Sequence, residues 1–227
     1  MYFDPTYILV LIGFVISIIA SANLKRTYKK YSEVTNRKGL TAQGVARDIL
    51  YRSGITDVTI EAVRGELTDH YSPTEKVLRL SESTINSTSI AAIGVAAHEC
   101  GHAIQHKNGY WPLKLRNAAV PLANIGSSLS IVVIMIGLIL GFMKLARVGV
   151  FLFLFVVLFE LITLPVEFNA SSRAMATLEG AGFLQQNELP MTAKVLRAAA
   201  LTYVAAALTA ILQLLRLLLI FGGGRRD

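Results

Sequence analysis

The chain has 227 residues, of which 53% are hydrophobic and only 16% are charged, and its mean hydropathy is +0.53. This composition argues against a water-soluble globule and favours a membrane protein. The formal net charge of +7 would suit nucleic acid or an anionic lipid surface, and the long apolar runs favour the lipid surface. The single cysteine, Cys100, excludes an intrachain disulfide framework.

The first apolar stretch runs from Thr6 to Leu24 without a charge and is long enough for one bilayer crossing. A cleaved signal peptide would carry basic residues before its apolar run, whereas here the basic residues follow it. We therefore predict that residues 1–24 form a retained N-terminal membrane anchor.

A polar region, residues 25–117, follows the anchor and opens with the basic segment "KRTYKKYSEVTNRKG". Residues 40–54 have the pattern of a short helix, with Thr41 as a cap at its start and Gly54 at its end. This region therefore begins with a basic juxtamembrane segment and one amphipathic helix.

Strand composition appears in the middle of the polar region. "DVTIEAV" (57–63) and "KVLRL" (76–80) favour strands, and "DHYSPTE" (69–75) between them favours a turn. We expect a small β-hairpin or sheet here, followed by a helix that begins near the small polar residues 87–89.

Three further apolar stretches are long enough to cross a bilayer: residues 118–143, 148–166 and 198–215. The chain after the polar region accordingly divides into a transmembrane hairpin, a helix with its connector, and a C-terminal transmembrane helix with its tail: residues 118–166, 167–197 and 198–227.

Most basic residues near these stretches lie in residues 23–117 and 167–197. The positive-inside rule places both segments in the cytoplasm. The predicted fold is a mainly α-helical, multi-pass protein of the plasma membrane, with about four transmembrane helices and a cytoplasmic region that contains the small sheet.

Residues 98–102, His-Glu-Cys-Gly-His, match the pattern H-E-x-x-H. On a helix, His98 and His102 share one face and can bind one cation. Glu99 is rotated by about 100° from His98, so it can approach a metal-bound water without being a ligand. We predict a Zn²⁺ site at which Glu99 is the general base of peptide hydrolysis.

The alternative interpretation is an amphipathic helix with an ordinary polar face. The preceding residues "IAAIGVAA" are small and apolar, which predicts a buried helix. Unpaired histidine and glutamate side chains would be costly there, so the metal site is favoured.

The third ligand does not come from the same helix. His106 lies about 12 Å along the axis from His98 and about 80° around it, so we expect it at the surface or behind a ligand. The metzincin pattern fails, because Gln105 and Asn108 stand where glycine and histidine are needed. His70 is a weaker candidate because it falls in a predicted turn.

A carboxylate can complete such a site, and the downstream candidates are Glu160, Glu167 and Glu179. Glu167 is preferred, because the chain crosses the membrane twice after His102 and so returns to the side of His98 directly before Glu167. Glu160 and Glu179 remain alternative ligands. Glu160 lies within an apolar stretch, where it would line a polar route, pair with Arg216 or pack between helices.

Four stretches resemble the YugP-type neutral zinc metallopeptidases of bacterial membranes: the anchor, "GELTDHYSPTEKVLRLSES", "GVAAHECGHAIQH" and "LPVEFNASSRA". The chain is more distantly similar to the HtpX and CAAX-protease group of gluzincins, in which a helix beginning E-x-x-A-D follows the motif. The resemblance implies a zincin-like (gluzincin) catalytic region in a bacterial cell membrane, with Glu167 as the third zinc ligand. Ser171 stands where the distant group has aspartate, so Asn169 or Ser171 is expected to orient a ligand histidine.

In related zincins, an edge strand beside the active helix pairs with the substrate backbone. "EKVLRL" or "GELTDHY" would do this by strand addition, with His70 and Tyr71 near the oxyanion, unless these are ordinary hairpin residues. Cys100 lies about 200° around the helix from His98, so we expect a small core residue.

The sequence therefore predicts a membrane-bound zinc metalloendopeptidase whose partners are the lipid bilayer and a peptide or membrane-protein substrate. A homo- or hetero-oligomer is compatible with the sequence. A non-catalytic scaffold or metal sensor is the alternative, although a pure binding site has no need for Glu99. Nucleic-acid binding is not expected, because membrane topology accounts for the basic residues near the spans.

Overall fold

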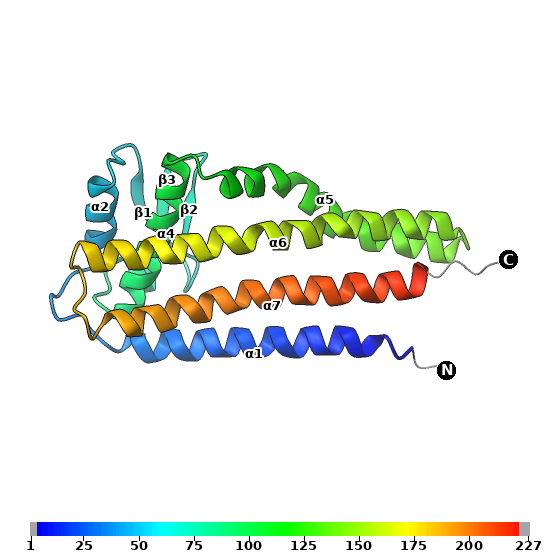
Figure 1. Cartoon of the computed structure of the whole chain (residues 1–227), viewed down its shortest axis with the longest axis horizontal. Coiled ribbons are helices and arrows are strands. Elements are labelled where there is room, and N and C mark those ends of the chain that lie inside the picture. The colour runs from blue at the N-terminus through cyan, green and yellow to red at the C-terminus, as the bar shows by residue number, and fades with distance from the viewer. Residues whose placement is uncertain (1–3, 223–227) are drawn as a thin grey trace. The chain divides into compact units, whose positions relative to one another are not determined.

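The structure is a computed structural model that describes residues 4–222. Within this range the chain forms helices and a three-stranded sheet (Figure 1). The elements are α1 (Tyr7–Ser32), α2 (Ala42–Arg52), β1 (Thr59–Val63), β2 (His70–Ser72), β3 (Val77–Ser81), α3 (Glu82–Ile85), α4 (Ile90–Lys107), α5 (Trp111–Ile139), α6 (Met143–Gly180) and α7 (Leu189–Phe221).

Four of these helices, α1, α5, α6 and α7, are long and apolar enough to cross a membrane. The prediction of a mainly helical membrane protein with four spans and a small sheet is confirmed. The helices extend beyond the apolar stretches at one or both ends, however, and α1 continues into the basic segment as far as Ser32.

The helix that the sequence predicted to begin at Glu167 is the continuation of α6, which passes through Pro165 without ending. A proline inside a helix removes one backbone hydrogen bond and costs about 3 kcal/mol. Beyond the proline, every fourth side chain is buried: Val166, Ala170, Ala174 and Leu178. This buried stripe packs the continued helix and offsets the lost bond.

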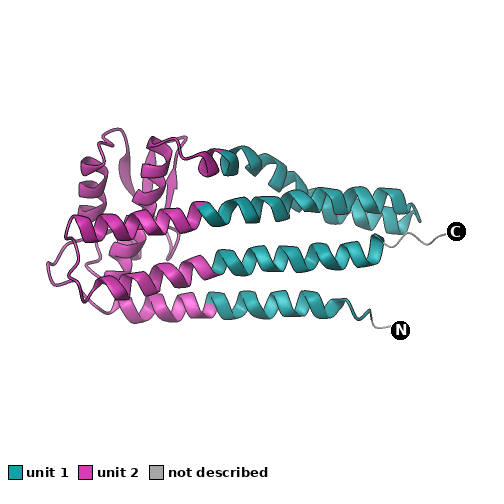
Figure 2. Cartoon of the chain, viewed as in Figure 1, with its two compact units in different colours: residues 1–21, 115–165, 202–227 teal, residues 22–114, 166–201 magenta. Residues whose placement is uncertain are grey.

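The chain divides into two compact units (Figure 2). Unit 1 contains residues 1–21, 115–165 and 202–227, and unit 2 contains residues 22–114 and 166–201. Each of the four long helices therefore contributes one part to each unit.

Unit 1 packs its helices through small residues. A methyl group at Gly137 of α5 would lie 2.5 Å from the backbone nitrogen of Ala146 in α6, so these backbones approach closely. Arg216 pairs with Asp4 at 3.4 Å and lies over the ring of Tyr7. The sequence offered Glu160 as a partner of Arg216, but in the structure the carboxylate of Asp4 pairs with Arg216 instead.

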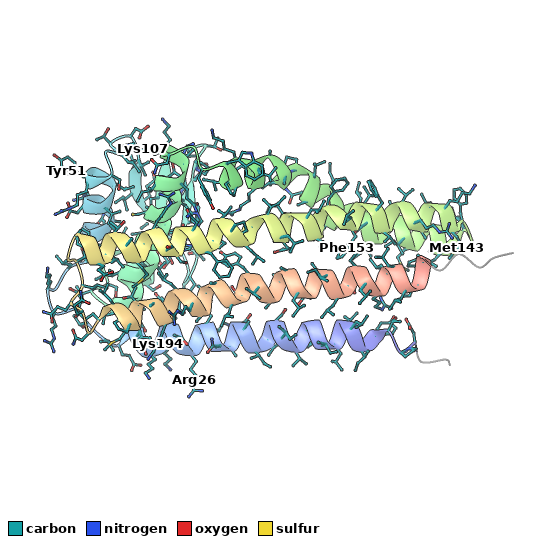
Figure 3. The ribbon with its side chains drawn as sticks, viewed as in Figure 1. Arg26, Tyr51, Lys107, Met143, Phe153 and Lys194 are labelled. Atoms are coloured by element: carbon teal, nitrogen blue, oxygen red, sulfur yellow. The ribbon has the colours of Figure 1, made fainter. Side chains whose placement is uncertain are left out.

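Unit 2 has a core built by α2, α4, the sheet and the adjoining part of α6. Thr41 caps α2 through its hydroxyl, and Gly54, with φ of +66°, follows its end, as predicted. Ser89 caps α4, also as predicted. Lys107, labelled in Figure 3, lies in the last turn of α4. Its amine donates to the carbonyl oxygen of Gly54 at 3.0 Å.

The sheet has the order β1-β3-β2, with β1 parallel and β2 antiparallel to β3. Residues 70–72, predicted as part of a turn, form β2, and only the residues after them turn the chain. The reason is pairing with β3, which sets Tyr71 opposite Leu78, while the Asp69 carboxylate accepts from the backbone N–H of Ser81 at 2.8 Å. Since β3 is the central strand, β2 has an open edge and β3 has none.

Candidate metal centre

The centre is built on α4, whose sequence is mostly alanine, glycine and isoleucine around the motif. These small residues let other helices approach the backbone of α4 closely. A methyl group at Gly101 would lie 2.5 Å from the carbonyl oxygen of Ala170 in α6. Gly101 therefore permits the contact that brings α6, and with it Glu167, to the two histidines.

Two imidazoles and one carboxylate converge at this contact. The Nε2 atoms of His98 and His102 lie 3.2 Å and 3.6 Å from the same oxygen, Oε2 of Glu167. The two rings are one helical turn apart, with centroids 4.8 Å from each other and planes at 87°. One ligand atom from each residue lies within 4.8 Å of the other two.

This arrangement fits a small divalent metal ion. With zinc–ligand bonds of about 2.0–2.1 Å in a tetrahedron, ligand atoms are separated by about 3.3 Å, close to both observed distances to Glu167. Two imidazoles and one carboxylate are also a ligand set that zinc accepts, with one position left open. Of the described residues, only His98, His102 and Glu167 form such a group.

The other ring nitrogen of each histidine has a protein partner. Nδ1 of His98 lies 3.1 Å from the hydroxyl of Ser171, and Nδ1 of His102 lies 3.0 Å from Oε1 of Gln105. These partners orient the rings so that both Nε2 atoms face Glu167. Sequence reasoning named Ser171 as a candidate for this contact.

Gln105 determines the tautomer of His102. Its amide nitrogen donates to the backbone carbonyl of Val166 at 2.8 Å and to Oδ1 of Asn169 at 3.0 Å. Because these two groups can only accept, the amide oxygen of Gln105 faces His102 and must accept from Nδ1–H. The lone pair of His102 is then on Nε2, where a metal ion needs it.

Sequence reasoning considered Gln105 only as a departure from the metzincin pattern and missed this role. The available signal was its spacing of three residues from His102 on a helix predicted to be buried. Gln105 is in fact completely buried. Asn169, the other candidate, touches Gln105 and accepts from Arg173 at 2.7 Å, so it acts one contact further from the histidines.

The electrostatics of the cluster favour a positive charge. Burial alone would lower the pKa of His102, but the hydrogen bond to Glu167 and the charges of Glu99 and Glu167 outweigh burial and hold that pKa above its ordinary value. A metal cation at this position would supply the positive charge in place of the proton.

Glu99 is buried, with 8% of its surface exposed. Within residues 4–222, no hydrogen bond or ion pair occupies its carboxylate, although its charge acts on the neighbouring His102. A buried carboxylate without a fixed protein partner, one residue from His98, is free to interact with water or substrate.

The remaining candidates lie outside the cluster. Tyr71 and His106 contact each other, hydroxyl to Nδ1, at 2.9 Å, and Nδ1 of His70 lies 2.9 Å from the backbone oxygen of Thr68. Glu179 is exposed near the end of α6, and Glu160 belongs to unit 1. Neither glutamate joins the two histidines.

Cys100 points into the core of unit 2, where its thiol lies 3.6 Å from the carbonyl oxygen of Ala46. Burial raises the pKa of the Cys100 thiol, which makes the reactive thiolate scarce. Its position agrees with the expectation of a small core residue.

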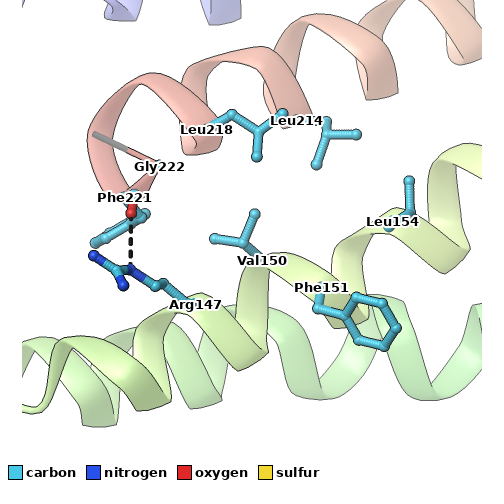
Figure 4. Close-up of a pocket in the computed structure, with 8 residues that line it drawn as sticks. All are labelled: Arg147, Val150, Phe151, Leu154, Leu214, Leu218, Phe221 and Gly222. Atoms are coloured by element: carbon cyan, nitrogen blue, oxygen red, sulfur yellow. Dashed lines mark hydrogen bonds between the residues drawn. The ribbon is translucent and has the colours of Figure 1, made fainter. Parts of the chain in front are cut away.

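Two apolar cavities lie outside the cluster. One, of about 420 Å³, is lined within unit 1 by Arg147 and apolar residues of α6 and α7, and the Arg147 guanidinium donates to the carbonyl oxygen of Phe221 (Figure 4). The other, of about 620 Å³, lies in unit 2, and Ser171 is among its lining residues. Only the second cavity therefore shares a residue with the surroundings of His98.

Four candidate spans and a His–His–Glu group, in which His102 and Glu167 are buried and His98 is half-buried, together define a membrane protein with a possible metal site. Residues 6–222 match the family described as "Putative neutral zinc metallopeptidase", and the chain belongs to that family. It is 47% identical over 212 residues to the "Putative membrane protease YugP" of Bacillus subtilis (strain 168), covering 93% of this chain and 94% of the relative. No solved structure matches the chain.

Proposed function

We propose that the protein is a membrane-bound zinc metalloendopeptidase of the gluzincin type, in which His98, His102 and Glu167 hold Zn²⁺ and Glu99 is the general base. The observation that carries this proposal is the convergence of two Nε2 atoms and one carboxylate oxygen at a largely buried position. A Zn²⁺ ion held by these three residues would supply the acidification of water and the polarisation of a peptide carbonyl.

Glu99 performs the proton transfers. Its carboxylate takes a proton from the attacking water, the remaining oxygen forms a bond to the peptide carbon, and the carbon–nitrogen bond breaks. Glu99 then returns the proton to the leaving amine, so one water is consumed for each bond cut. The absence of a fixed partner for this carboxylate among the described residues supports the role.

The substrate is an extended segment of a peptide or membrane protein. The open edge of β2 supports pairing with a substrate backbone by strand addition. His70 and Tyr71 lie on this strand and are our candidates for stabilising the oxyanion. The apolar cavity that includes Ser171 would hold a hydrophobic side chain of the substrate.

The active site faces the cytoplasm in this proposal. Residues 22–114 and 166–201 form unit 2 and contain most of the cations near the ends of the spans, including Lys25, Lys29 and Lys194. The positive-inside rule assigns such segments to the cytoplasmic side of the plasma membrane.

Replacing Glu99 with glutamine tests the mechanism. The purified Glu99→Gln protein should keep one zinc per chain and lose hydrolysis of fluorescently labelled casein by about 10²- to 10⁴-fold, the usual contribution of a general base. Glu33→Gln, which changes an exposed glutamate directly after α1, is the matched control and should cleave normally. Full activity of Glu99→Gln would refute the assigned base, and zinc without any cleavage by the wild type would favour a metal sensor.

A further inference from the structure

A cationic pocket lies in unit 2 between the C-terminal part of α1 and the N-terminal part of α7. Its volume is about 420 Å³, within the range of about 300–1,000 Å³ typical of small-ligand sites. Its lining includes two polar and four cationic residues: Asn23, Thr27, Arg26, Lys30, Lys194 and Arg197. Among the described residues, no aspartate or glutamate lines it.

Residues 4–222 supply no counter-ion to the four cations. Within the described part of the chain none of them forms an ion pair, and all four side chains are exposed. Lys30 makes one charged contact of another kind, with its Nζ 5.5 Å from the ring centre of Tyr31. Like charges around one hollow repel each other, and a bound anion would relieve that repulsion.

The chemistry of the lining suits a phosphate group. Arg26 and Arg197 can each donate two parallel hydrogen bonds to phosphate oxygens, and Lys30 and Lys194 add point charges. The amide of Asn23 and the hydroxyl of Thr27 can donate further bonds. Figure 3 labels Arg26 on α1 and Lys194 on α7, which come from the two walls of the pocket.

The position along each helix points to a lipid rather than a soluble ion. In α1 the apolar stretch ends at Leu24, two residues before Arg26 and six before Lys30, and in α7 an apolar stretch begins directly after Arg197. Both sets of cations therefore lie at the end of a candidate span, at the level of the headgroups. Leu201 adds an apolar wall on the side where the α7 span begins.

We propose that this pocket binds the headgroup of an anionic phospholipid, with its phosphate among the four cations and the start of its acyl chains beside Leu201. Basic pockets between membrane helices bind such headgroups in general. A soluble phosphate would meet the same cations but would leave the apolar continuation unused. The pocket shares Arg197 and Leu201 with the lining of the apolar cavity near Ser171 but contains no residue of the metal cluster, and lipid binding does not depend on peptidase activity.

The test is a titration of the full-length protein in neutral detergent with short-chain phosphatidylglycerol, in which native mass spectrometry counts the bound lipid. Each cation near anionic lipid contributes about fivefold in affinity, so Arg26→Gln/Lys30→Gln should bind about 30-fold more weakly. Lys194→Gln/Arg197→Gln, on the other wall, should show the same loss.

The matched control is Lys25→Gln/Lys29→Gln, which removes the same charge from the same exposed segment of α1 but changes no lining residue. It should bind phosphatidylglycerol as the wild type does, and an equal loss would overturn the proposal in favour of a diffuse surface charge. Phosphatidylcholine should not bind, and equal binding of it would also overturn the proposal. Displacement of the lipid by an equal concentration of inorganic phosphate would assign the pocket to a soluble anion instead. Unchanged zinc content and elution volume would show that the variants are folded.

Discussion

Unit 1 exposes large apolar side chains: 77% of the surface of Ile139 and 61% of that of Ile131 is exposed. Unit 2 instead buries polar side chains, and the exposed fractions of Gln105, Glu167 and His102 are only 0%, 2% and 9%. An exposed apolar surface on spanning helices needs only lipid to cover it, so one apolar residue can replace another there with little effect. A buried polar side chain needs a partner at a defined distance. The two units therefore differ in how much each position depends on its neighbours, and variants should reveal this difference.

The largest expected effect is the loss of the metal from unit 2. His98→Ala and Glu167→Gln each remove a proposed ligand and should weaken zinc binding by more than about 100-fold, beyond the range seen for residues behind the ligands. Elemental analysis after dialysis should find no zinc in either purified variant. Glu179→Gln changes an exposed glutamate in the same helix and should retain it. A full zinc complement in Glu167→Gln would move the third ligand elsewhere.

Gly101→Ala and Gly137→Ala compare close packing in the two units directly. In both cases the added methyl group would lie 2.5 Å from a backbone atom of α6. Both variants should therefore lower the free energy of unfolding of their own unit, toward the upper end of about 1–3 kcal/mol. Only Gly101→Ala should also release zinc, because Gly101 sets the distance from α4 to Glu167.

Thermal unfolding and zinc content, measured on both glycine variants, give the comparison. Gly137 is far along the chain from every proposed ligand. Zinc loss from Gly137→Ala at an unchanged stability of unit 2 would therefore contradict the expectation that only Gly101→Ala releases zinc.

A smaller effect is expected from the contacts behind the ligands. Gln105→Met keeps the size of the side chain but removes the acceptor for Nδ1–H of His102, and zinc affinity should fall by about 10- to 100-fold. Ser171→Ala should act on His98 in the same way. Competition with a fluorescent chelator measures both affinities, and Ser172→Ala, an exposed neighbour, serves as control. If Gln105→Met bound zinc with the affinity of the wild type, the His102 ring would not need a hydrogen-bond partner at Nδ1.

The smallest effect concerns Cys100. Because burial raises the pKa of its thiol, a water-soluble maleimide should leave the folded protein unlabelled at neutral pH and label it once after denaturation. Tyr51→Cys places a thiol at a side chain that is 74% exposed in the same unit and should react in the folded state. Rapid labelling of Cys100 would show that the core of unit 2 opens.

Local patterns in the sequence were sufficient for several features. Hydropathy predicted the four spans, because a bilayer needs a long uncharged helix whatever its neighbours are. Thr41, Gly54 and Ser89 marked helix ends through their own backbone and side-chain chemistry. The pairing of His98 with His102 followed from helical spacing alone.

Tertiary structure decided the features that depend on distant residues. Glu167 lies 69 positions from His98, and only the close approach of α4 and α6 selects it over Glu160 and Glu179. The contact of Gln105 with Val166, the open edge of β2 and the gathering of cations from α1 and α7 likewise depend on packing. Periodicity describes one element at a time, whereas these contacts join elements whose separation in the chain carries no geometric information.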